Sequence, residues 1–238
     1  MMAEALAPPT LSMAVLLTLL LCLGASVAVY AVLVRRETTR RGWVALSDWA
    51  KSAGLGVTHN PTALPAAAEI FSQFHPKVRL LFSGRRTHLL QFTTDALPAA
   101  GGEATQWHVL LRELATAQER KWDPTGLRPA TQTLSLLDQF SLSSFPSLSA
   151  GQRFVVFGTR PAPAKALAES SAAALTPPDV GIVLHGSVLA LDFSSRPFDT
   201  IEFGRMLAVA DQLEQHIPPP PGLAAAEEEN GSQPIPSL

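Results

Sequence analysis

A long apolar run near the start of the chain, Leu11–Val34, constrains it more than any other feature. The run has no charged residue and is rich in Leu, Val and Ala. At about 1.5 Å per residue a helix of this length measures about 36 Å, and the hydrocarbon core of a bilayer is about 30 Å thick. Because backbone polar groups in lipid must be satisfied within the segment, a helix is the expected form. The run therefore predicts a transmembrane helix at residues 11–34, in contact with the lipid bilayer.

A cleaved signal peptide is the main alternative for this run. Such a peptide needs a basic start, a short apolar stretch and a small-residue cleavage site. Residues 1–10 contain no Lys or Arg, and the apolar run continues well past the weak Ser26-Val27-Ala28 site. Leu21, directly before Cys22, is not the small residue that a lipoprotein signal places there. These features argue against cleavage.

Four arginines directly after the run, Arg35, Arg36, Arg40 and Arg41, predict its direction. Clusters of Lys and Arg beside a span stay on the cytoplasmic side. We therefore expect residues 1–10 outside, a basic juxtamembrane linker at 35–42, and the remainder cytoplasmic at the inner membrane of a bacterium. The arginines could also attract anionic lipid headgroups, at about 1 kcal/mol each, or simply be solvated.

The periods of apolar residues predict a body of mixed helices and strands at residues 43–217. Helical spacing predicts helices at 43–53, 64–74, 163–175 and 197–217. Alternation or short buried runs predict strands at 77–82, 88–93, 131–137, 153–158, 180–185 and 188–193. Thr105–Leu114 fits a strand and a helix about equally, and we favour the strand. Hairpins with helices grouped between and after them indicate an α+β domain with a mostly antiparallel sheet and helices packed on it.

The tail at residues 218–238 is expected to be disordered, because it is rich in Pro and Glu and has few large apolar groups. Just before it, the stretch Phe154-Val155-Val156-Phe157-Gly158, an Ala-rich helix, the 180–193 hairpin and the closing amphipathic helix resemble the C-terminal half of uncharacterised bacterial membrane-anchored proteins. The DUF3137-like group is one example. The resemblance covers about 65 residues and rests on the apolar pattern. It implies no activity and no functional residue.

Motifs that carry chemistry are not evident in the sequence. Gly54-Leu55-Gly56 lacks the third glycine of a dinucleotide loop and follows a helix, so it is better explained as a helix stop. With Cys22 as the single cysteine, a Cys-based metal site is excluded, and the six histidines show no metal-ligand spacing. We therefore predict no catalytic residue, no cofactor and no metal. Residues 42–217 carry 14 basic and 15 acidic side chains, and this nearly neutral balance argues against a nucleic-acid partner.

Two arrangements of polar residues nevertheless deserve a structural test. His88 and His108 lie on predicted strands and could meet across a sheet. Lys77, Arg79, Arg85 and Arg86 form the most basic part of the body, either as the solvated side of a hairpin or as a surface for anionic lipid or an acidic partner.

These features favour a membrane-tethered binding or scaffold module with an unidentified protein partner. The alternative is an enzyme with an unrecognised site. It requires several of Asp95, His108, Asp138 and His185 to converge in a polar pocket.

Overall fold

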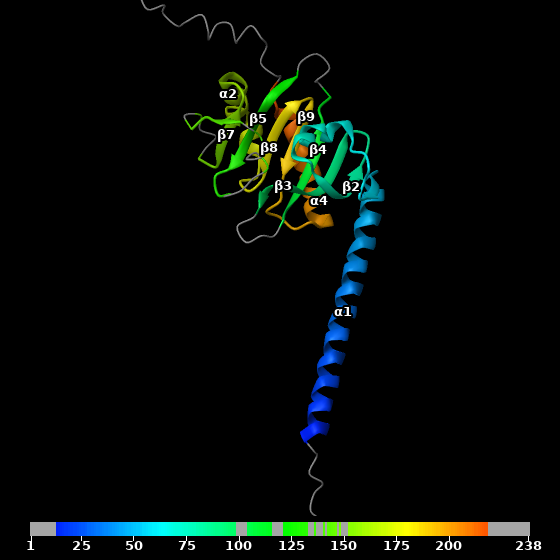
Figure 1. The fold of residues 1–238 in the computed structure, drawn as a ribbon. Coiled ribbons are helices and arrows are strands. Elements are labelled where there is room, and N and C mark those ends of the chain that lie inside the picture. The colour runs from blue at the N-terminus through cyan, green and yellow to red at the C-terminus, as the bar shows by residue number, and fades with distance from the viewer. Residues whose placement is uncertain are drawn as a thin grey trace, which may run out of the picture. The chain divides into compact units, whose positions relative to one another are not determined.

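A computed structural model describes residues 13–98, 104–115, 121–132, 136, 140, 142–146, 148 and 152–218. The chain divides into two compact units, Met1–Asp48 and Trp49–Leu238. The elements run in the order α1 (Met13–Ser52), β1 (Gly56–His59), the 3₁₀ helix η1 (Ala66–Phe74), β2 (Lys77–Ser83), β3 (Thr87–Pro98), β4 (Ala104–Glu113), β5 (Trp122–Pro129), β6 (Ser143–Ser144), β7 (Phe154–Gly158), α2 (Pro161–Ala168), α3 (Ser171–Leu175), β8 (Gly181–Gly186), β9 (Val188–Asp192) and α4 (Thr200–His216) (Figure 1).

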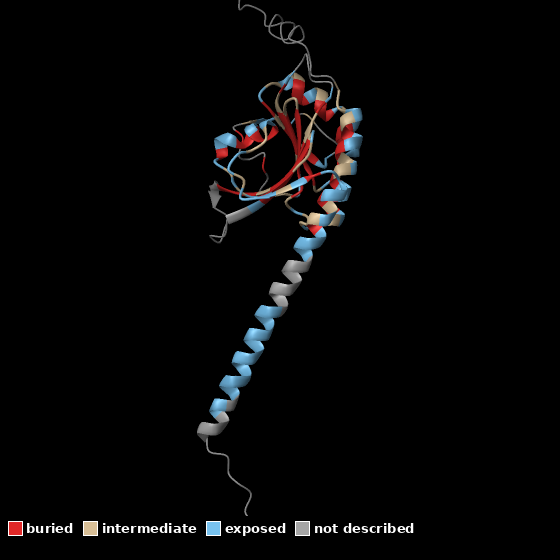
Figure 2. Ribbon diagram, turned by 90° about the vertical axis from the view of Figure 1, so that its right-hand side faces the viewer, coloured by how far each residue is buried: buried red, intermediate tan, exposed pale blue. Residues whose placement is uncertain are grey.

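The first unit consists of most of helix α1, which continues without a break through the expected linker at residues 35–42. Every described side chain from Leu17 to Leu33 is exposed, as the pale blue stretch in Figure 2 shows. Within the described residues, no helix reaches the length and apolar character that a membrane crossing requires. The span expected at residues 11–34 stays a prediction.

The C-terminal end of α1 belongs to the second unit and confirms the predicted helix stop. Gly54 has a φ of 71°, a left-handed conformation that glycine adopts without steric cost. Its amide donates to the Lys51 carbonyl at 3.0 Å, and the Leu55 amide donates to the Ala50 carbonyl at 2.8 Å. These two bonds form a Schellman motif, which satisfies carbonyls that the helix end leaves free. Leu55 is buried directly after the turn.

Among the described residues, the second unit is built on a nine-stranded sheet in the order β1-β2-β3-β4-β9-β8-β5-β7-β6. Every strand pair is antiparallel, which confirms the α+β class with an antiparallel sheet. Both predicted hairpins are present, and His185 pairs with Val188 across the Gly186-Ser187 turn as expected. The ambiguous segment 105–114 is mostly strand β4, which lies between β3 and β9 near the middle of the sheet.

Both faces of the sheet are covered at the second half of β2, so the half-buried alternation expected for this strand is incomplete. Leu80, Leu81 and Phe82 are all buried. Phe82 packs against Phe203 of α4, with ring centroids 5.7 Å apart, whereas Leu81 joins the cluster that contains Phe71 of η1. Successive strand residues point to opposite faces, so one strand contributes to two cores.

The strand predicted around residues 131–137 is tested only in part. Its described residues are not in a strand, since Thr131 is in a turn and Leu136 is in a 3₁₀ turn, whereas residues 133–135 and 137 lie outside the described part. A strand that was not predicted, β5, lies just before it at Trp122–Pro129. Pro124 and Pro129 argue against a strand in the sequence, because proline cannot donate to a ladder. The register with β8 shifts between Trp122 and Thr125, and this bulge accommodates Pro124.

Three predicted helices differ in detail. The segment 64–74 is a 3₁₀ helix, and the predicted helix 163–175 is two shorter helices. Ser170 separates them, because its side chain caps α3 by accepting from the Ala173 amide. The last helix begins at Thr200, after the Asp199 cap, and not at Pro197.

Candidate anion-binding pocket

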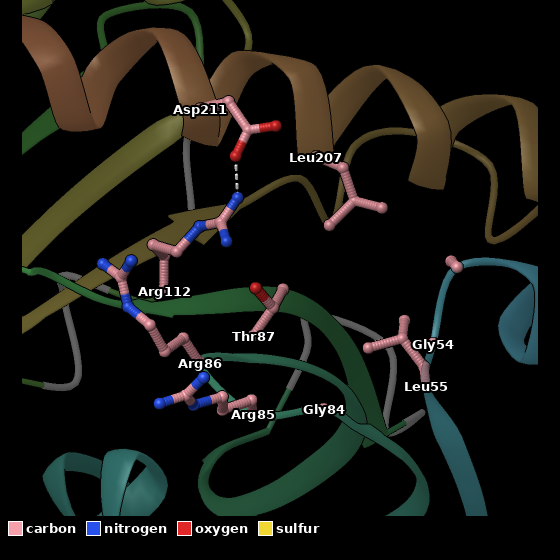
Figure 3. Close-up of a pocket in the computed structure, with 10 residues that line it drawn as sticks. Gly54, Leu55, Gly84, Arg85, Arg86, Thr87, Arg112, Leu207 and Asp211 are labelled. Carbon is pink, nitrogen blue, oxygen red and sulfur yellow. Dashed lines mark hydrogen bonds and ion pairs between the residues drawn. The ribbon is translucent and has the colours of Figure 1, made fainter.

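A pocket of about 460 Å³ lies in the second unit, where four segments far apart in the sequence meet. They are the end of α1, the β2–β3 turn, the end of β4 and helix α4, from which Leu207 and Asp211 face the pocket (Figure 3). Its volume is within the range of small-molecule sites, about 300–1,000 Å³. The lining residues are Ala53, Gly54, Leu55, Gly84, Arg85, Arg86, Thr87, Arg112, Leu207 and Asp211.

Gly84 allows the β2–β3 turn to lie against the end of α1. A Cβ atom at this position would lie 2.7 Å from Leu55 Cδ2, closer than side-chain packing tolerates. The Gly84 amide donates to the Thr87 carbonyl at 2.8 Å and closes the turn. The turn therefore places Arg85 and Arg86 at the pocket.

Arg86 is fixed by the protein on two sides. Its Nε donates to the Glu113 carbonyl at 2.9 Å, and its guanidinium forms an ion pair with Glu214 of α4. The Ala115 amide also donates to Glu214 Oε1, at 3.1 Å. Burial acts to raise the pKa of Glu214, but these hydrogen bonds and the neighbouring guanidiniums outweigh it, so the pKa lies below its ordinary value. Arg86 and Glu214 thus join the β2–β3 turn to α4.

Arg112 comes from the end of β4 and is the most buried cation of the pocket. Its side chain is 14% exposed, whereas that of its ion-pair partner Asp211 is 61% exposed. Burial lowers the pKa of Arg112; Glu214 opposes that change and nearby Arg86 adds to it. Arginine still remains charged at neutral pH. The result is a largely desolvated guanidinium whose hydrogen-bonded partner, Asp211, is on the solvent side.

Arg85 is the exposed member of the set. Among the described residues we find no ion pair or hydrogen bond of its side chain. The lining of the pocket carries three guanidiniums against one carboxylate, so 3 − 1 = +2. Glu214, which reaches Arg86 from behind the lining, reduces the balance to +1. The pocket therefore favours an anion.

The structure brings together only part of the predicted basic surface. Arg85 and Arg86 lie at the pocket, whereas Lys77 and Arg79 are at the opposite end of β2, where Lys77 lies about 23 Å from Gly84 at about 3.3 Å per residue. Arg112 was not predicted. The only sequence signal for it is a charge that follows the buried run at 109–111.

Arg35, Arg36, Arg40 and Arg41 lie in helix α1, in the first unit. Their side chains lie outside the described part of the structure.

His88 and His108 do not meet. They lie on neighbouring strands, but His88 pairs with Leu111 and His108 pairs with Gln91, three positions away. His88 Nδ1 is 2.9 Å from Ser83 Oγ, and His108 packs on the Phe198 ring at a centroid distance of 4.7 Å. Burial lowers the pKa of both imidazoles. Each is held as a structural histidine of the sheet.

The residues of the enzyme alternative are not assembled by the described structure. His185 pairs with Val188 of β9, and Val188 pairs with Glu113 of β4. Glu113 is five residues from His108 along β4, so His185 and His108 are separated by about 17 Å in the strand direction. The side chain of Asp95 and all of Asp138 lie outside the described residues. In the part of the chain that the structure describes, no cluster of three or more His, Cys, Asp or Glu could hold a metal ion.

Asp192 shows how buried polar groups are used in this domain. It is 2% exposed, and its carboxylate accepts from the Leu136 amide at 2.9 Å and from Ser194 Oγ at 2.6 Å. Ser194 Oγ in turn accepts from the His108 amide at 2.9 Å. The network ties Leu136 to the sheet, which is a structural role.

Comparison with known proteins identifies one similar solved structure and no related family. No family model and no curated protein matches the chain. Among solved structures, the chain is similar to the crystal structure of the mycobacterial trehalose monomycolate transport factor A, TtfA. The two are 12% identical with a TM-score of 0.48, over 75% of this chain and 97% of the other.

Proposed function

We propose that this chain is a single-pass membrane protein whose α+β domain is a cytoplasmic binding or scaffold module. The observation that carries the proposal is the exposed apolar surface of α1. Leu17, Leu21 and Tyr30 are 56%, 66% and 70% exposed, and the other described side chains between Leu17 and Leu33 are also exposed.

Apolar residues cover this helix on all sides, because residues in sequence are about 100° apart around its axis. Surface kept in water costs about 25 cal/mol per Å² of apolar area. A bilayer would remove that cost along the whole segment, whereas a single protein groove would cover one side. The proposed span, residues 11–34, includes residues 11–16, 19 and 34, whose side chains lie outside the described part.

The direction of the proposed span rests on the four arginines after Val34. In that orientation the α+β domain lies on the cytoplasmic side, where anionic lipids give the bilayer surface a negative potential. The positive balance of the pocket suits binding there. A partner protein with an acidic surface would meet the same charges.

Topology and membrane integration can be tested together. We expect a fluorescent reporter fused after Leu238 to fold in the cytoplasm, a phosphatase that needs export to stay inactive there, and the protein to resist carbonate extraction. Changing Arg35, Arg36, Arg40 and Arg41 to Gln should give mixed orientation while carbonate resistance is kept. Release by carbonate, or an active exported phosphatase on the unchanged protein, would contradict the proposal.

The partner can be sought in membranes solubilised with a mild detergent. We expect the intact protein to co-purify with a specific membrane or cytoplasmic protein, and Arg85→Glu with Arg86→Glu to weaken that association. Arg79→Glu, an exposed substitution away from the pocket, is the matched control. Equal loss from both variants would show that the pocket is not the contact.

A further inference from the structure

The pocket has two chemically different sides. Figure 3 shows Arg85, Arg86 and Arg112 on one side and Leu55 and Leu207 on the other. Leu207 is half-buried on α4, and Leu55 is held by the end of α1. A small inorganic anion would contact only the basic side, whereas a ligand with an apolar stem would contact both.

The basic side has donor capacity that the protein does not fully use. Arg112 Nε is buried without a hydrogen-bond partner, with Glu214 Oε2 3.8 Å away. Arg85 has no ion pair among the described residues. Guanidinium groups bind phosphate and carboxylate oxygens through paired N–H donors. Two carboxylates oppose an incoming anion, Glu214 behind the lining and Asp211 at the solvent side, and the exposed Asp211 is the one that a ligand can replace.

We propose that this pocket binds an anionic amphiphile, with the charged headgroup on Arg85 and Arg112 and the start of the apolar chain against Leu55 and Leu207. A lipid of the bilayer and a free amphiphile share this chemistry. Helix α1 runs unbroken to Ser52, so the 19 residues from Val34 to Ala53 span about 28 Å at about 1.5 Å per residue, and a tethered domain would stay within about that distance of the bilayer surface. The bilayer as the source rests on the proposed function, whereas the binding chemistry does not.

Binding can be measured with the full chain in nanodiscs of phosphatidylcholine, with three small probes: hexyl phosphate, inorganic phosphate and hexanol. We expect hexyl phosphate to bind at least about tenfold more tightly than either of the others, because each buried methylene contributes about 0.8 kcal/mol. Equal affinities for hexyl phosphate and inorganic phosphate would overturn the proposal, as would the absence of binding at millimolar concentration.

Four variants assign the contacts. We expect Arg85→Gln to weaken binding of both phosphates by about fivefold or more, and Leu207→Ser to weaken hexyl phosphate alone. Asp211→Asn should strengthen both, because it removes a competing carboxylate from an exposed position. Arg79→Gln, at the far end of β2, should change nothing. Circular dichroism confirms that each variant is folded. Equal effects of Arg85→Gln and Arg79→Gln would overturn the assignment.

The lipid composition of the nanodisc identifies the source. Replacing about a third of the phosphatidylcholine with phosphatidylglycerol should lower the apparent affinity for hexyl phosphate if bilayer lipid enters the pocket. An unchanged affinity would assign the site to a free amphiphile. A chain that is not tethered would still bind hexyl phosphate, so failure of the membrane proposal and failure of this one can be told apart.

Discussion

At the scale of single residues, the polar side chains of the α+β domain mostly bind backbone groups and neighbouring elements. Arg196 is an example, because it joins Asp179 at 2.6 Å to Glu202 of α4 at 2.9 Å. The hydrogen bond from Arg196 holds the pKa of Asp179 below its ordinary value. Such residues contribute to stability, and their removal should be visible in unfolding measurements.

Asp199 provides a direct test of helix capping. Its Oδ1 accepts from the Ile201 amide at 3.0 Å and the Glu202 amide at 2.9 Å, which satisfies two free donors at the start of α4. We expect Asp199→Ala to lower the free energy of unfolding by about 1 kcal/mol, and Asp199→Ser to restore most of it. Urea unfolding followed by circular dichroism measures both. Equal free energies of unfolding for the proteins with Asp, Ser or Ala at position 199 would contradict the capping role.

The buried histidines predict a pH dependence. Burial lowers the pKa of His88, partly offset by Glu113, and of His108, partly offset by a backbone hydrogen bond. In the unfolded chain these two imidazoles bind protons near the ordinary histidine pKa of about 6.5, whereas in the folded chain they bind protons only at lower pH. We expect the free energy of unfolding to be constant above about pH 7.5 and to fall as the pH drops below 6.5.

The fall in the free energy of unfolding should level off once the pH is below the folded-state pKa of His88 and His108. His88→Gln should reduce the slope, and the variant with His108→Gln as well should reduce it further. The Asp179 carboxylate loses its contribution only below about pH 4, because its folded pKa lies under the ordinary value, so it does not act in this window. A free energy of unfolding that stays constant from pH 7.5 to 5.5 would refute the prediction.

At the scale of elements, the β8–β9 hairpin depends on its turn. Gly186 has a φ of 59°, which costs an L-residue about 1–2 kcal/mol. We expect Gly186→Ala to lower the free energy of unfolding by about 1 kcal/mol. Gly204 is the matched control: it lies within α4 with open space around it, so Gly204→Ala should raise stability by about 0.5–1 kcal/mol. If both substitutions changed the free energy of unfolding in the same direction, the left-handed backbone at Gly186 would not be what requires glycine there.

Helix α4 is held on the sheet by aromatic packing. Phe203 is fully buried, and its ring contacts those of Trp49, Phe82 and Phe198. We expect Phe203→Ala to cost about 3–5 kcal/mol, because it leaves a cavity between helix and sheet. Ile201, two residues earlier and 65% exposed, is the control, and Ile201→Ala should change stability by less than about 0.5 kcal/mol. Thermal unfolding separates the two outcomes.

At the scale of the whole molecule, the second unit contains all strands of the described sheet and the hydrophobic cluster packed against it. A single core of this size is normally sufficient for independent folding. We therefore expect a protein shortened to residues 43–218 to remain folded and to unfold in one cooperative transition. Calorimetry and near-ultraviolet circular dichroism test this. A shortened protein without a cooperative transition would show that the apolar helix is needed for folding.

The sequence by itself determined the local features, because turns, caps and apolar periods depend on residues close in the chain. Gly54 as the stop of α1, the two hairpins and the strand predicted at 153–158, which the structure has as β7, follow from such local rules, although Val155 and Phe157 of that strand are only half-buried. The tertiary structure alone decided that Trp122–Pro129 is a strand, because its pairing with β7 and β8 overrides two prolines.

The pocket also depended on the tertiary structure. Arg112 comes beside Arg86 only because β3 and β4 pair, and both meet Glu214 only because α4 packs on that sheet. These contacts join residues that are 26 to 128 positions apart in the chain, and no local pattern encodes such distances. The apolar run and its arginines were evident from the sequence, whereas a site with both basic and apolar sides required the fold.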